Sequence, residues 1–148
     1  MRKKYEKIDT RLKVDFGGMI NPNSIDTEVA VLGTLLLYNK SILNIITLLS
    51  PDDFYSERHQ VIYSSIISVY KKGSDVTTLN VVKELRSTGE IEFCGGASYI
   101  VGLSNKAYNG DLKEIALHVL ELSKKRQLVE LGTNITYKAY QDTQDVFE

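Results

Sequence analysis

From Ser24 onward, apolar side chains recur every three or four residues, which is the spacing of a helix rather than the alternation of a strand. The first stripe predicts a helix over residues 24–38. Ser24 is its expected N-cap, because a serine hydroxyl can accept a hydrogen bond from an unpaired backbone amide. The stripe consists of Ile25, Val29, Leu32 and Leu36. Ala30, Gly33 and Leu37 widen the apolar face, and the two small residues would let a neighbouring helix approach closely.

Similar stripes predict five further helices, separated by residues that stop a helix. Their expected ranges are 42–49, 56–72, 78–89, 99–103 and 111 onward. Pro51 cannot continue the hydrogen-bond ladder of the second helix, and Gly73 can adopt the left-handed conformation that closes the third. Thr78 is the expected N-cap of the fourth helix. These patterns predict an all-α protein, a compact bundle of about six helices of which the last is long.

Two stretches between or within these helices are less regular. Residues 91–93 are expected to form a short extended link into a turn at Gly95 and Gly96. The last helix has Leu112, Ile115, Val119 and Leu122 as its stripe. Its patterning weakens after Arg126, and Gly132 is expected to bend or end it.

Composition and cysteine usage exclude several classes of protein. The chain has 148 residues, of which 43% are hydrophobic and 25% charged, as in a single globular domain. One cysteine excludes an internal disulfide, and one cysteine with two histidines cannot form a Cys/His zinc site. Apolar runs break well short of the roughly 20 residues that a bilayer requires, so no membrane contact is expected. A cytoplasmic location fits these features.

The formal net charge of −1 conceals an uneven distribution. Residues 1–13 carry a net charge of +4, which leaves −5 for the rest of the chain. Residues 1–21 therefore form a basic leader, interpreted as a flexible tail, with an arm that touches nucleic acid or an acidic partner as the alternative. Residues 22–108 are expected to be the globular helical domain. Residues 109–148 would contain the long final helix.

The candidate chemistry does not assemble into a catalytic site. No glycine is followed by lysine, so the phosphate-binding G-x-x-x-x-G-K-[ST] loop is absent from the sequence. His59 is expected to be a structural histidine that hydrogen-bonds a loop, rather than an acid, a base or a metal ligand. Cys94 is expected to be a small buried hydrophobe, and His118 to be solvated. Asp52 and Asp53 could form an acid–base pair, but capping of the next turn is favoured.

Lys124, Lys125 and Arg126 form the strongest internal basic run. Glutamates are interleaved along the same stretch, so a solvated mixed face is the simpler interpretation and a docking surface is the alternative. Nine tyrosines against four phenylalanines suit a protein with interfaces. The residues thus favour an interaction module over a catalyst.

Five motifs in order resemble the N-terminal domain of DnaB-type replicative DNA helicases. They are P-x-S-x-x-x-E-x-x-V-L-G-x-L-L-L from residue 22, S-P-x-D-F-Y-x-x-x-H-x-x-I-Y from residue 50, L-x-x-x-G from residue 85, G-G-x-x-Y-x-x-x-L from residue 95 and L-x-x-x-R-x-L from residue 122. The motif residues expected to be structural are Glu28, Leu32, Gly33, Asp53, Phe54, Tyr55, His59, Tyr63, Gly95, Gly96 and Tyr99. The chain departs from the family pattern at Thr77, where aspartate is common, and at Ile115 and His118.

The resemblance implies a role in DNA replication, within the primosome. Family members unwind DNA as hexamers, using ATP and magnesium in a motor domain that this sequence does not contain. The N-terminal domain forms a collar on the ring by pairing with its neighbours, and it receives a DnaG-type primase and in some members a helicase loader. The last helix would be the first arm of the pairing hairpin that leads into the linker, with residues 145–147 opening the second arm. The chain itself would then have no catalytic residue, cofactor or metal, and DNA would be contacted mainly by the motor domain.

A second interpretation remains open from the residues alone. The basic leader and the run from Lys124 to Arg126 could serve a small helical protein that binds nucleic acid.

Overall fold

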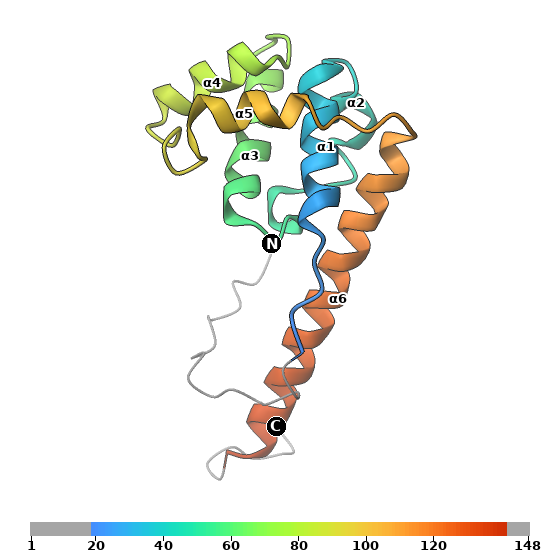
Figure 1. Ribbon diagram of the computed structural model, residues 1–148. Helices are drawn as coiled ribbons and strands as arrows, with labels where there is room; N and C mark the ends of the chain where they lie inside the picture. Colours follow the sequence, from blue (N-terminus) through green and yellow to red (C-terminus); the bar gives the residue numbers. More distant parts are fainter. Residues whose placement is uncertain (1–18, 142–148) are drawn as a thin grey trace. The chain divides into compact units, whose positions relative to one another are not determined.

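The structure is a computed structural model that describes residues 19–141, and over these residues all regular secondary structure is helical (Figure 1). The elements are α1 (Ile25–Leu37), α2 (Ile42–Ile45), the 3₁₀ helix η1 (Pro51–Asp53), α3 (Glu57–Lys71), α4 (Thr78–Ser87), α5 (Gly96–Ser104) and α6 (Leu112–Ala139). The all-α prediction is confirmed. Most of the basic leader and residues 145–147 lie outside the described residues. The described residues divide into two compact units, one formed by residues 23–124 and the other by residues 19–22 and 125–141.

Helix α1 is the central helix of the 23–124 unit. The Ser24 hydroxyl accepts a hydrogen bond from the Thr27 amide at 3.3 Å, which confirms the predicted N-cap. Every residue from 31 to 36 is buried, because α3 and α5 both pack on this helix. The predicted stripe therefore names too few buried residues in the middle of the helix, where the whole circumference is covered. Two members of the predicted apolar face are not buried, since Ile25 of the stripe is 40% exposed and Leu37, which was expected to widen the face, is 53% exposed.

Gly33 allows the close helix contact that its size predicts. A side chain of even one carbon at this position would collide with the carbonyl oxygen of Leu103 in α5. The backbones of α1 and α5 can therefore approach directly.

Helices α3 and α4 end in the same way. Gly73 and Gly89 have φ of 76° and 74°, and each allows its chain to fold back onto the last turn. The amides of Ser74 and Glu90 donate to the carbonyls of Val69 and Leu85 at 3.2 and 2.9 Å, as in a Schellman motif. Both predicted stops are confirmed.

Three local predictions are wrong. The N-cap of α4 is Thr77 and not Thr78, because the Thr77 hydroxyl accepts from the Asn80 amide at 3.2 Å. Helix α2 ends at Ile45, and turns replace the rest of the expected helix. Residues 91–93 form turns rather than an extended link, since without a partner strand their backbone bonds locally, for example from Gly96 N to the carbonyl oxygen of Ile91 at 2.9 Å.

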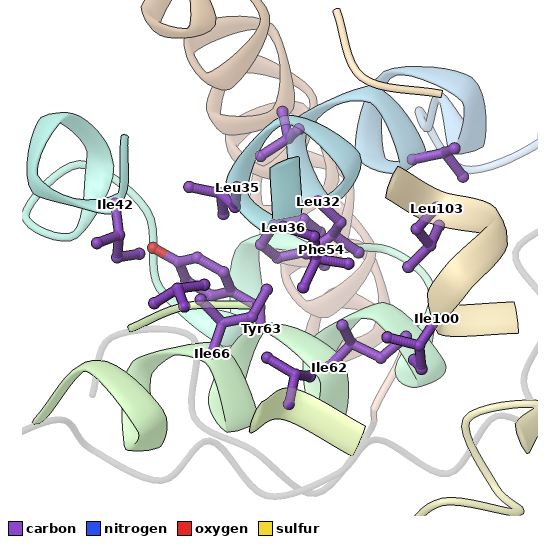
Figure 2. Packing of buried hydrophobic residues seen from close by; sticks show 14 of the residues in the cluster. Leu32, Leu35, Leu36, Ile42, Phe54, Ile62, Tyr63, Ile66, Ile100 and Leu103 are labelled. Atoms are coloured by element: carbon purple, nitrogen blue, oxygen red, sulfur yellow. The ribbon is translucent and has the colours of Figure 1, made fainter. Parts of the chain in front are cut away.

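The core of the 23–124 unit is built from side chains of α1, α2, α3, α4 and α5 together with the loop residue Phe54. Figure 2 labels members of this core from α1, α2, α3 and α5, together with Phe54. The Phe54 and Tyr63 rings lie with their centroids 5.0 Å apart. The first part of α6 adds Leu112, Ala116 and Val119. Its buried face is rotated from the predicted stripe, because Ala116 and Ser123 are buried where Ile115 and Leu122 are only half-buried. Helix α6 does not end at Gly132.

No helix within residues 19–141 combines the length and apolar character needed to cross a bilayer.

Candidate functional site

A buried polar network joins three helices of the 23–124 unit. His59 of α3 is 1% exposed, and its ring nitrogens contact Glu28 of α1 and Tyr99 of α5. The Nδ1–Oε2 distance to Glu28 is 2.6 Å, and the Nε2–hydroxyl distance to Tyr99 is 2.7 Å. A carboxylate can only accept, so Nδ1 carries the proton and donates to Glu28. The sequence singled out all three residues separately, and the structure brings them together.

Glu28 also holds the start of α3. Its Oε1 accepts a hydrogen bond from the Tyr55 amide at 2.5 Å, and its Oε2 lies 3.4 Å from the Ser56 amide. Ser56 is the N-cap of α3, but its own side chain makes no capping bond. The buried carboxylate thus faces the positive end of the α3 dipole, which helps to stabilise its charge.

Both ring nitrogens of His59 face protein side chains. Both ring nitrogens are engaged, so neither is available to a substrate or a metal. The prediction of a structural histidine agrees with this geometry, but the predicted partner is wrong. His59 bonds to side chains of two helices and not to a loop. Among residues 19–141 no group of three His, Cys, Asp or Glu side chains could hold a metal ion.

Tyr99 carries the network toward the surface. Its side chain is half-buried, and the exposed Arg58 places its guanidinium 4.6 Å from the centre of the ring. Gly95, with φ of 92°, and Gly96, with φ of 77°, form the turn that begins α5 and so position Tyr99. The expectation of a turn at this glycine pair is confirmed.

The buried carboxylate of Asp53 makes a second set of polar contacts. Its Oδ2 accepts from the Ser50 amide at 2.8 Å and lies 3.1 Å from the Ser50 hydroxyl. Its Oδ1 accepts from the Ser123 hydroxyl of α6 at 2.8 Å. Asp53 therefore caps the turn that contains it, rather than the next turn, and its contacts are those of a structural residue. Sequence reasoning missed Ser123, because serine is mostly an exposed residue and this one lies outside the predicted apolar stripe of the helix.

Tyr63 and Cys94 are both held in their neutral forms. Burial raises the pKa of Tyr63 to about 12, with a further contribution from Asp53, and the Tyr63 hydroxyl donates to the Leu49 carbonyl at 3.2 Å. Burial also raises the pKa of Cys94 to about 11, with Glu90 acting in the same direction. A protonated, fully buried thiol is a poor nucleophile, in agreement with the prediction of a small core residue.

The three residues of the basic run on α6 differ in exposure. Lys124 and Lys125 are exposed, whereas Arg126 is half-buried and donates from Nη1 to the Pro22 carbonyl at 2.9 Å. His118 is exposed, as expected, with Nδ1 3.8 Å from Glu121.

The sequence and fold match a known family. The family model described as DnaB-like helicase N terminal domain matches residues 20–121. The chain belongs to this family. The match covers the first four of the five motifs, and the buried residues described above lie within it, apart from Ser123.

Individual relatives agree with this assignment. The chain is 30% identical over 131 residues to a replicative DNA helicase DnaB of Rhodothermus marinus, with 88% of this chain and 14% of that protein covered. It is 32% identical over 120 residues to the replicative DNA helicase DnaC of Bacillus subtilis, with 80% of this chain and 26% of that protein covered. The chain thus spans less than a third of the length of these curated relatives.

Solved structures share the fold. The N-terminal domain of DnaB helicase from Mycobacterium tuberculosis superposes with a TM-score of 0.81 at 31% identity, over 86% of this chain and 90% of that one. The corresponding domain from Helicobacter pylori, whose structure was described with its interactions with primase, gives a TM-score of 0.69 at 17% identity, over 78% and 91%. At that identity the second likeness supports the fold alone.

Proposed function

We propose that this chain is the non-motor N-terminal domain of a replicative DNA helicase, where it acts in the cytoplasm as a hexamer collar and a docking module for primase. The observation that carries the proposal is the family match over residues 20–121, in a chain that lacks a phosphate-binding loop. The parent protein would unwind DNA with ATP and magnesium in a separate motor domain. That domain, and not this one, would make most contacts with DNA.

The described side chains suit a scaffold that presents surfaces to partners. The polar residues singled out from the sequence are engaged in contacts that join helices. Glu28, His59 and Tyr99 connect α1, α3 and α5, and Asp53 connects η1 to α6. A rigid unit of this kind limits the entropy lost when a partner binds.

Self-association is supported by the later part of α6. Leu128, Leu131 and Ile135 are 66%, 53% and 61% exposed and are spaced as one helical stripe. A second copy of this helix would cover them. Leu131→Glu should weaken self-association measured by sedimentation velocity, whereas Glu130→Lys, on the other side of the helix, should not. Equal behaviour of the two variants would contradict pairing through this stripe.

Primase docking is tested by titration. The chain should bind the C-terminal domain of a primase from the same genome, and the absence of binding at about 100 µM would count against direct docking. Because a ring can add avidity, the same titration should be repeated with the full-length hexamer. A helicase loader can be tested in the same format. ATPase activity in the purified chain would contradict the non-motor assignment.

The contribution of the basic run, Lys124 to Arg126, to primase docking can be tested by reversing its charges. The exposed amines of Lys124 and Lys125 would favour an acidic surface on a partner. The double variant Lys124→Glu/Lys125→Glu should slow association with primase and reduce its salt dependence, compared with Lys71→Glu/Lys113→Glu. Equal kinetics in both double variants would remove the run from the docking surface.

A further inference from the structure

The loop that joins α5 to α6 contains the pair Asn109-Gly110 (Figure 1). In such a pair the backbone nitrogen of the glycine can reach the asparagine side chain most easily, because glycine has no Cβ to block the approach. Every other asparagine of the chain is followed by a residue with a side chain. Asn109 is therefore the asparagine whose sequence context most favours an attack on its side-chain amide.

Both groups that would react are accessible in the folded protein. Asn109 and Gly110 are exposed. Neither the side chain of Asn109 nor the amide of Gly110 makes a hydrogen bond within residues 19–141. The attacking nitrogen is therefore not held by a carbonyl, and the side chain can rotate toward it.

The ring of Tyr108 packs over Gly110. A Cβ at position 110 would lie 2.4 Å from Cε1 of this ring, so any other residue there would displace the ring. The backbone of Tyr108 is itself held, because its amide donates to the Thr34 hydroxyl of α1 at 2.9 Å. The packing therefore favours, next to Asn109, the residue type that leaves the attacking amide unhindered.

Asn105, at the start of the same loop, provides a contrast. It is also exposed, as the C-cap of α5. The amide that follows it belongs to Lys106 and donates to the Leu103 carbonyl at 2.9 Å. To attack the Asn105 side chain, this nitrogen would have to give up its hydrogen bond and approach past a Cβ. Of these two exposed asparagines, Asn109 is the one followed by an amide that is available to react.

From these features we infer that Asn109 is a site of spontaneous deamidation. The Gly110 nitrogen forms a bond to Cγ of Asn109, and the side-chain nitrogen leaves as ammonia with the proton that the Gly110 amide loses. The product is a five-membered succinimide. Water then opens this ring, giving aspartate if the new bond from the Gly110 nitrogen to Cγ breaks, and isoaspartate if the original peptide bond breaks. The reagent is water, and no oxidant or reductant takes part.

The two products differ in their effect on the loop, which is fixed on both sides of the reacting pair. Tyr108 is bonded to α1 on one side. On the other side Asp111 caps α6, because its Oδ1 accepts from the Lys113 amide at 2.9 Å. Aspartate at position 109 keeps the backbone length and adds a negative charge near the amino end of α6, where the helix dipole favours it. Isoaspartate lengthens the backbone by one carbon, so the bond to α1 or the cap must shift.

Mass spectrometry of the incubated full chain tests the inference, which does not depend on the proposed function. After incubation at mildly alkaline pH, trypsin releases Asn109 in the peptide of residues 107–113 and Asn105 in the peptide of residues 87–106. Deamidation adds about 1 Da to a peptide. It should be about tenfold or more faster at Asn109 than at Asn105, because only the latter requires a hydrogen bond to break.

Two variants and a reference peptide sharpen the comparison. Asn109→Gln should remove the mass increase from the peptide of residues 107–113, because its longer side chain would have to close a six-membered ring. Asn105→Gln should leave that increase unchanged. Equal rates at the two asparagines would overturn the inference. So would a rate at Asn109 more than about tenfold below that of a synthetic peptide of residues 107–113, because the folded loop would then protect the site.

The structural consequence is tested on the separated products. The isoaspartate form should unfold at a lower temperature than the unmodified chain, whereas Asn109→Asp should unfold at the same temperature or slightly higher. An isoaspartate form as stable as Asn109→Asp would contradict a loop that is fixed on both sides.

Discussion

The carboxylate of Glu28 in α1 accepts a hydrogen bond from Nδ1 of His59 in α3 across 31 residues of sequence, and both side chains are almost inaccessible to water. Such a pair is costly to break, because the remaining partner stays buried without compensation. The same carboxylate accepts backbone amides at the start of α3. Glu28 therefore joins α1 both to the start of α3 and to His59 of the same helix.

Replacement of Glu28 by glutamine tests this role. The glutamine side chain would keep the shape of the original but lose the charge that His59 and the α3 amides stabilise. We expect Glu28→Gln to lower the free energy of unfolding by about 1–3 kcal/mol, measured by urea denaturation. The control Asp26→Asn changes an exposed carboxylate on the same helix and should stay within about 0.5 kcal/mol. Equal effects of the two changes would contradict a special role for Glu28.

The contacts between α1 and α3 separate the features that the sequence predicts from those that it does not. Helical periodicity and the stops at Gly73 and Gly89 are local signals, so the number and order of helices could be predicted. The partners of His59 could not, because Glu28 and Tyr99 are 31 and 40 residues away and their contact depends on how helices pack. The rotated face of α6 has the same origin, since the buried Ser123 donates to Asp53, which is 70 residues away in the sequence.

The contact between α1 and α5 can be tested with two glycines. Gly33→Ala would place a carbon against the Leu103 carbonyl, and should cost about 1–3 kcal/mol of stability because two backbones must move apart. Gly102→Ala, on α5, meets no neighbouring atom and should instead stabilise the protein by up to about 1 kcal/mol. Thermal unfolding of both variants checks the prediction. If Gly33→Ala were as stable as Gly102→Ala, the helices would not pack as closely as described.

Cys94 gives a prediction about pH. Its pKa is about 11 in the folded protein against an ordinary value of 9.0, so the folded state holds this proton more tightly than the unfolded state. The contribution of the thiol to stability is therefore fully present below pH 9 and is lost as pH rises toward 11. The stability difference between wild type and Cys94→Ala should shrink over this window. A difference that is constant from pH 8 to pH 11 would mean that the thiol is not buried as described.

Thiol reactivity provides an independent measurement at neutral pH. A protonated and fully buried Cys94 should react with an aromatic disulfide reagent only when the protein opens. The reaction should therefore accelerate as urea is added below the unfolding transition. Rapid labelling in native buffer, at the rate of a free thiol, would contradict both the burial and the raised pKa.

Ser65 and Ser123 are buried helical serines that the same substitution should affect in opposite directions. The Ser65 hydroxyl is buried and has no hydrogen-bond partner within residues 19–141, whereas the Ser123 hydroxyl donates to Asp53 at 2.8 Å. Ser65→Ala removes an unpaired polar group and improves helix propensity, so the protein should be unchanged or up to about 1 kcal/mol more stable. Ser123→Ala leaves a buried carboxylate oxygen without its donor and should cost about 1–3 kcal/mol. Urea denaturation of the two variants decides the matter, because a loss of stability in Ser65→Ala as large as that in Ser123→Ala would show that Ser65 has a partner in solution.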